Sequence, residues 1–225
     1  MKDFSAEYEK RLSEVELYFD TLHLLDKGSC SIKCVNILGN EEERDIDTNL
    51  SKILKANGFL LLYNMVEATI ANSIQAIFDS MHSAQITYRD LTEKLRRMWI
   101  RQEFKNLGQN NILFDILSKV VDDNILSFSK DCVNISGNID AQRIREISEQ
   151  FGCQQISDGR HLCTIKEKRN KLAHGEYTFA EIGKDYSVSD MEVFKNSVKE
   201  YLTKVMDEIE KFINNKGYSK TKSTY

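Results

Sequence analysis

Arg169 and His174 are the residues of this 225-residue chain whose types and spacing best fit chemistry on a phosphodiester bond. They lie five positions apart in the cationic and polar segment 164–176. An imidazole can move a proton near neutral pH, and a guanidinium can hold two phosphate oxygens in a fixed fork. This pair suits metal-independent RNA cleavage, in which the 2′-hydroxyl attacks its own adjacent phosphate, His174 assists proton transfer and Arg169 stabilises charge on the phosphorane. DNA lacks that hydroxyl and should resist cleavage.

The spacing of this pair sets a geometric condition. On an ideal helix, two residues five positions apart point about 140° away from each other. Both can address one phosphate only if the helix end loosens at Gly175 or if another element completes the groove. A symmetric dimer supplies such an element, because the same helix of each subunit can face its partner across a two-fold axis. The simpler alternative is a helix C-terminus with a favourably placed cation.

Further polar residues are candidates for supporting roles. Asn64 and Glu67 lie three positions apart on one side of an otherwise apolar helix, where unpaired polar groups are costly. Glu67 either orients Arg169 or His174, or it belongs to a structural ion pair or an exposed position. Three lysines either guide the RNA backbone or form a solvated charge run: Lys166, Lys168 and Lys171. We interpret the basic face between Lys94 and Lys105 as a solvated helix surface outside the site.

A metal site is an alternative that the spacing does not favour. Cys153, His161 and Cys163 match no zinc-finger pattern, and Cys30 and Cys34 form a Cys-x3-Cys pair without a second half. His23 and His82 lie in or at the end of predicted helices without a nearby nucleophile. We therefore expect no metal or other cofactor, and structural roles for these residues.

The composition favours long helices. Proline is absent, glycine numbers ten, and 41% of the residues are hydrophobic. Apolar periodicity and capping patterns predict an all-α, antiparallel bundle of about five to seven helices. Helices are expected over 3–26, 47–82, 110–128, 140–152 and 158–174, and the helix over 47–82 should be the most enclosed one. Two more helices are expected to open with capping boxes: one begins at the Thr87–Asp90 box, and the last begins at the Ser189–Glu192 box and ends near 217. The stretch 27–44 is expected to be a surface loop, and 129–138 a polar break with room for a short strand.

The length and the charge of the chain limit its domain organisation and its partners. We expect one helical domain over residues 1–215 and a flexible C-terminal tail over 216–225. The net charge of −4 excludes a wholly basic nucleic-acid coat. No apolar run reaches bilayer length, and the start of the chain lacks the apolar core of a secretion signal. Five cysteines without a regular framework favour reduced thiols, so we expect a cytoplasmic protein without disulfides.

A longer string carries a family resemblance. Ile165-Lys166 followed by Arg169-Asn170-Lys171-Leu172-Ala173-His174-Gly175 resembles the Arg-x4-6-His motif of the HEPN superfamily, in particular of its stand-alone bacterial members. The string Leu62-Tyr63-Asn64-Met65-Val66-Glu67 and the final amphipathic helix are also similar to that group. The resemblance thus covers most of the chain, although only the segment 169–174 is specific.

This resemblance implies a helical bundle that dimerises with the two motifs facing each other. It implies an endoribonuclease that leaves a 2′,3′-cyclic phosphate and a 5′-hydroxyl, acting as a toxin or in defence against phage. Arg169 and His174 are then the catalytic pair, and Asn170 is the polar residue that often follows the arginine. Some members carry a tyrosine two residues after the histidine that a partner nucleotidyltransferase modifies. Here position 176 is Glu and the tyrosine is Tyr177, so that pattern is not matched.

The expected partners are an RNA substrate, a second copy of the chain, and an antitoxin or other defence-system protein, with no membrane. A catalytically inactive helical module that binds RNA or a protein partner, such as a toxin–antitoxin subunit, is the alternative. A zinc-supported binding protein is a third hypothesis.

Overall fold

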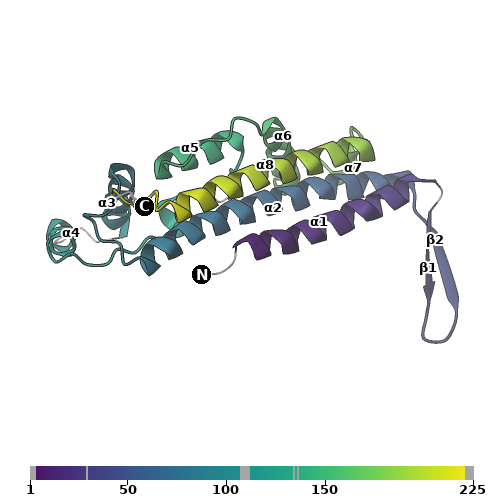
Figure 1. Ribbon diagram of the computed structural model, residues 1–225. Coiled ribbons are helices and arrows are strands. Elements are labelled where there is room, and N and C mark those ends of the chain that lie inside the picture. Colours follow the sequence, from purple (N-terminus) through teal and green to yellow (C-terminus); the bar gives the residue numbers. More distant parts are fainter. Residues whose placement is uncertain (1–3, 29, 107–111, 134, 136, 221–225) are drawn as a thin grey trace. The chain divides into compact units, whose positions relative to one another are not determined.

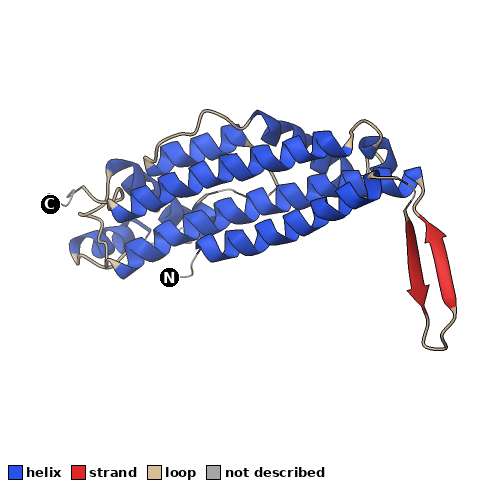
Figure 2. Cartoon of the chain, turned by 45° about the vertical axis from the view of Figure 1, so that its right-hand side comes forward, coloured by secondary structure: helices blue, strands red, loops and turns tan. Residues whose placement is uncertain are grey.

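The computed structural model describes residues 4–28, 30–106, 112–133, 135 and 137–220. This part of the chain is all-α apart from one small antiparallel hairpin, which confirms the predicted fold class (Figure 2). Its elements in chain order are α1 Phe4–Asp26, β1 Ser31–Val35, β2 Glu41–Asp45, α2 Thr48–Ser83, α3 Glu93–Asn106, α4 Ile112–Val121, the 3-10 helix η1 Lys130–Cys132, α5 Ala141–Phe151, α6 Arg160–Ala173, α7 Phe179–Gly183 and α8 Val188–Asn214. The described residues thus hold eight α-helices, one more than the upper end of the prediction, because the five-residue α7 gives no periodic signal.

The described chain forms two compact units. Unit 1 comprises Met1–Glu7, Glu67–Asp158 and Tyr201–Tyr225, and unit 2 comprises Tyr8–Val66 and Gly159–Glu200. The long helices α2 and α8 supply residues to both units. Arg169 and His174 belong to unit 2.

Aromatic packing makes the core of unit 2. On α1 the buried residues recur at three and four positions, as expected for one apolar helix face. Phe59 of α2 lies 5.0 Å from Tyr186 and 5.3 Å from Phe194 between ring centroids, both in edge-on geometry. Gly183 ends α7 so close to α2 that an added Cβ would lie 1.8 Å from the Lys52 carbonyl oxygen. Only glycine therefore allows this packing of α7 on α2.

Unit 1 has its own aromatic core. Phe78 of α2 stacks on Phe128 at 5.2 Å and packs against Phe151 at 5.6 Å. The predicted α5 caps are confirmed: the Asp140 carboxylate accepts a hydrogen bond from the Arg143 amide at 2.8 Å, and Gly152 ends the helix at φ 85°. Both caps satisfy backbone groups that a helix end otherwise leaves unpaired.

The segment 27–44 is not the expected loop but contains most of a β-hairpin. β1 and β2 pair antiparallel with Ser31 opposite Asp45 and Val35 opposite Glu41, and all ten strand residues are exposed. The hairpin extends from the connection between α1 and α2 (Figure 1). The surface position was predicted, whereas the strands were missed because the run Glu41–Asp45 is charged and has low strand propensity. In the expected polar break, the described residues form η1 and no strand.

Two predicted helix starts are wrong by a few residues. The Asp90 carboxylate accepts hydrogen bonds from the amide and hydroxyl of Thr87, which closes a turn, and α3 begins only at Glu93. The N-terminus of α8 is capped by Ser187 with Asp190, in place of Ser189 with Glu192, so the helix begins two residues earlier, at Val188. In both cases the Ser/Thr-x-x-acid pattern identifies the right turn region but not the first helical residue.

Two predicted C-terminal boundaries also differ. The helix predicted over 110–128 ends at Val121, because Asp123 turns the chain at φ 50°; its first two positions, 110 and 111, lie outside the described residues. The start of the expected tail is packed: Tyr218 is 2% exposed, and its carbonyl accepts a hydrogen bond from the Thr92 amide. Residues 221–225 of that tail are outside the description. None of the helices that the structure describes has the length and hydropathy to cross a bilayer.

Candidate functional site

The candidate site lies at the C-terminal end of α6. Leu162, Ile165 and Leu172 are buried and anchor the helix in unit 2. His174 is the C-cap, and Gly175 follows at φ 69°. The Glu176 amide donates to the Lys171 carbonyl and the Gly175 amide to the Leu172 carbonyl, which is the bond pattern of a Schellman motif. The stop predicted at Gly175 therefore has a specific backbone geometry.

Arg169 is held by contacts from two sides. Its guanidinium carbon lies 4.5 Å from the centroid of the Tyr63 ring, within the range of a cation–π interaction. One guanidinium nitrogen donates a hydrogen bond to the side-chain oxygen of Asn170 at 3.0 Å. Tyr63 is 1% exposed and belongs to α2, so it offers a fixed platform. The guanidinium is half-buried and thus oriented before any ligand arrives.

His174 contrasts with Arg169, because its side chain is exposed. Its backbone is still right-handed helical, with φ −89° and ψ −3°. The break therefore comes one residue too late to bring the two side chains together, and the separation of about 140° expected for a helix is retained. Within the described residues the imidazole has no side-chain hydrogen bond or ion pair, so it is accessible to a ligand.

The three predicted RNA-binding lysines are half-buried on the same helix. Lys168 Nζ lies 5.7 Å from the centroid of Tyr186, and Lys171 Nζ lies 5.2 Å from that of Tyr177. Lys171 also pairs with Glu167 at 2.7 Å, and this hydrogen bond raises the pKa of the lysine. Lys168 and Lys171 line a small cleft of about 190 Å³ with residues of the α6–α7 connection and α7. Lys166 also interacts with other groups of the protein, so it is not an unpaired cation.

The predicted supporting residues of α2 have different surroundings. Asn64 is exposed, so its amide can be solvated and needs no protein partner. Glu67 belongs to unit 1, where its carboxylate accepts a hydrogen bond from the Gly137 amide at 2.7 Å. An orienting role of Glu67 toward Arg169 or His174 stays a prediction.

Two of the remaining histidines contact other side chains of unit 2. His23 Nε2 lies 3.2 Å from a carboxylate oxygen of Glu192, and His161 packs edge-on against Phe194 at 5.2 Å. All five cysteines are free thiols. No group of three or more His, Cys, Asp or Glu side chains is placed to hold a metal ion in the ranges that the structure describes.

Sequence reasoning missed the aromatic partners of the cations. Tyr63, Tyr177 and Tyr186 each lie against one cation of α6; Tyr63 comes from α2, and the other two come from the connections before and after α7. Tyr63 stands within the string that carries the family resemblance, which is the one sequence signal that could have pointed to it.

An all-α fold with an arginine and a histidine of the Arg-x4-6-His pattern at one helix end is typical of HEPN-type helical domains. The chain belongs to the HEPN superfamily: the family model described as HEPN_MAE_28990-like HEPN matches residues 2–218. A search of curated proteins gave no match. A search of solved structures gave none either. The superfamily includes ribonucleases, and its members bind RNA and often dimerise.

Proposed function

We propose that the protein is a metal-independent endoribonuclease in which Arg169 and His174 act on one scissile phosphate. The 2′-hydroxyl attacks the adjacent phosphate and the 5′-oxygen leaves, so the products carry a 2′,3′-cyclic phosphate and a 5′-hydroxyl. His174 carries the proton, Arg169 stabilises the negative charge of the phosphorane, and Asn170 positions the guanidinium. Lys166, Lys168 and Lys171 attract the RNA backbone.

The observation that carries this proposal is the preorganised guanidinium of Arg169. A cation stacked on a buried ring and fixed by Asn170 keeps the other N–H groups of its fork available. A preorganised donor costs little reorganisation when charge develops on the phosphate. The accessible imidazole of His174 on the same helix end supplies a group that can accept and donate a proton.

The direct test is cleavage of RNA by the purified protein in the presence of EDTA, with mapping of the product ends. We expect cyclic-phosphate ends from RNA and no cleavage of DNA. Arg169→Ala and His174→Ala should each lose at least about 100-fold in rate, the loss typical of removing one catalytic group. Arg160→Ala, at the exposed start of α6, and His82→Ala, at the exposed end of α2, are the matched controls. Equal cleavage by the site variants and the wild type would refute the assignment.

We further propose that the active form is a homodimer with the site at its interface. Since Arg169 and His174 diverge on α6, the two groups at one phosphate come from different subunits. Mixing Arg169→Ala with His174→Ala should therefore restore activity, because about half of randomly exchanged dimers carry one arginine and one histidine facing each other across the axis. Mixtures that stay as inactive as the separate variants would exclude a shared site.

The proposed biological role is that of a toxin or phage-defence effector. Expression of the wild-type chain should then arrest growth, while the Arg169→Ala and His174→Ala chains should not. Growth arrest by the inactive variants would separate toxicity from cleavage.

One observation favours a second candidate, a catalytically inactive HEPN module that binds RNA or a protein partner. The described residues provide no hydrogen bond that would fix the tautomer of His174, which a general base normally requires and a binding module does not. Its signature would be RNA binding without new product ends under any condition.

A further inference from the structure

A second cationic feature lies in unit 1, on residues that the proposed catalytic site does not use. Helix α3 packs against α5 and η1, and the three elements border an open cleft of about 850 Å³. This volume lies in the upper part of the range found for ligand sites in proteins. The basic face of α3, expected to be a plain solvated surface, thus forms one wall of a cleft.

The charge of this cleft is predominantly positive. Five cationic side chains line it, against the two carboxylates of Glu146 and Glu149. Arg143 already pairs with Glu146 at 3.1 Å, and Arg97 pairs with Glu93. The described residues offer no hydrogen bond or ion pair to the side chains of Lys94, Arg101 and Lys105. These three cations are exposed and line the cleft, which Glu149 also lines.

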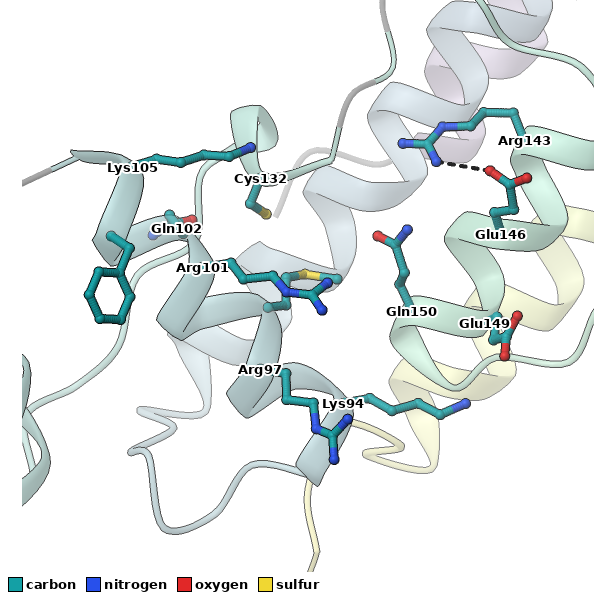
Figure 3. A pocket seen from close by; sticks show the side chains of 12 residues that line it. Lys94, Arg97, Arg101, Gln102, Lys105, Cys132, Arg143, Glu146, Glu149 and Gln150 are labelled. Carbon is teal, nitrogen blue, oxygen red and sulfur yellow. Dashed lines mark hydrogen bonds and ion pairs between the residues drawn. The ribbon is translucent and has the colours of Figure 1, made fainter.

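The cations are arranged as a row. Arg97, Arg101 and Lys105 follow each other at intervals of four residues, which places them on one stripe of α3 with a repeat of about 6 Å. Figure 3 shows Arg101 extending from α3 toward the side of the cleft that Gln150 of α5 lines. A chain of negative charges can pair with the whole row, whereas a single small anion can meet only one or two of its members.

An aromatic side chain stands beside this row. Phe104 lines the same cleft and is 50% exposed, although a phenylalanine gains free energy by burial. Ligands that combine a polyanionic backbone with flat apolar rings are single-stranded nucleic acids, which bind to grooves that pair cations with stacking aromatic residues. An acidic protein segment would use the cations but not the ring.

We propose that the cleft between α3 and α5 is a binding site for single-stranded RNA, in which phosphates lie along Arg97, Arg101 and Lys105 and a base stacks on Phe104. The choice of RNA rests on the proposed function, whereas the binding of a single strand does not depend on cleavage. The proposed cleavage of RNA and the proposed binding of a single strand can therefore be refuted separately.

The test measures binding by fluorescence anisotropy with the full-length protein. The probe is a labelled single-stranded deoxyoligonucleotide of about 12 nucleotides, a length in the range of known single-strand sites, which the protein cannot cleave because it lacks the 2′-hydroxyl. The double variant Arg101→Glu/Lys105→Glu should bind at least about tenfold more weakly. Its control is Lys204→Glu/Lys220→Glu, which makes the same charge change at exposed positions of unit 1 outside the cleft.

The salt dependence separates phosphate contacts from a change in folding. Each lost contact to a single strand lowers the slope of log K against log salt by about 0.7, so the double variant should lose about 1.4. Phe104→Ala should weaken binding about fivefold or more with an unchanged slope, since stacking releases no counterions. Phe114→Ala, which removes a ring that is 71% exposed on α4, should leave binding unchanged. Arg101→Gln/Lys105→Gln repeats the test without reversed charges.

The proposal is overturned if the cleft variants bind the probe within twofold of their controls. It is also overturned if a polyglutamate peptide competes as well as an oligonucleotide of equal charge, which would identify a site for an acidic protein segment. Binding by a protein that cleaves no RNA would refute the proposed function and leave this cleft assignment intact.

Discussion

The ring of Tyr63 should set the activity of Arg169, and replacing it with leucine tests this directly. The guanidinium lies 4.5 Å above a ring that is 1% exposed, and Arg169 itself is half-buried. Cation–π interactions contribute about 0.5–1 kcal/mol at exposed sites and about 2 kcal/mol when desolvated. This contact therefore contributes about 1–2 kcal/mol to the orientation of Arg169. Without the ring, Arg169 stabilises the transition state less, by about this amount of free energy.

The assay is the rate of RNA cleavage under single-turnover conditions. A loss of about 1–2 kcal/mol corresponds to about 5- to 30-fold in kcat/KM for Tyr63→Leu. Tyr63→Phe keeps the ring and should stay within about twofold of the wild type. The comparison isolates the ring, because both variants remove the same hydroxyl.

A double-mutant cycle in stability supports this test without using activity. Urea unfolding of Tyr63→Leu, Arg169→Ala and the double variant should give a coupling free energy of about 1 kcal/mol between the two positions. A coupling near zero, or equal rates for Tyr63→Leu and Tyr63→Phe, would refute the idea that the ring positions the guanidinium.

Three further predictions concern stability and reactivity. Gly183→Ala should destabilise the protein by about 2–3 kcal/mol in urea unfolding, because its Cβ would lie 1.8 Å from the Lys52 carbonyl oxygen; an unchanged midpoint would contradict the packing of α7. Burial raises the pKa of Cys153 to about 12, so iodoacetamide at about pH 8 should modify the exposed Cys163 first, and Cys153 should react faster only as the pH rises and forms its thiolate. Equal labelling of Cys163 and Cys153 at about pH 8, measured by mass spectrometry, would contradict this order. Tyr218→Ala should cost about 3 kcal/mol by removing a side chain that is 2% exposed, and thermal unfolding of a variant without this loss would show that the segment after α8 does not stabilise unit 1.

The long helices could be predicted because their apolar residues repeat over many turns. The predicted bounds of the helices at 3–26 and 47–82 differ from those of α1 and α2 by at most one residue at each end. The hairpin could not be predicted from periodicity, because none of its strand residues is buried and the charged strand β2 has no apolar residue that could alternate. Its register depends on pairs between the strands, such as Lys33 with Glu43 at 3.3 Å, which no single segment reveals.

The candidate site was predictable where its parts are close in sequence. Arg169, Asn170 and His174 share one helix end, and the motif names them together. The ring under Arg169 comes from α2, and the wall that faces the basic side of α3 comes from α5. These pairings arise from tertiary packing, which a single sequence without an alignment does not disclose.

The divergence of the two catalytic candidates is the physical reason to expect a second subunit. Arg169 is held against a ring of α2, while His174 is exposed on a helical turn that ends only at Gly175. Unwinding the last turn to turn His174 toward Arg169 would break the two backbone hydrogen bonds of the Schellman motif, each of which contributes about 1 kcal/mol. A second copy facing the first across a two-fold axis brings an imidazole to the guanidinium at no such cost. Activity should therefore rise with the square of concentration below the dimer dissociation constant, and a first-order dependence there would require the helix end to unwind instead.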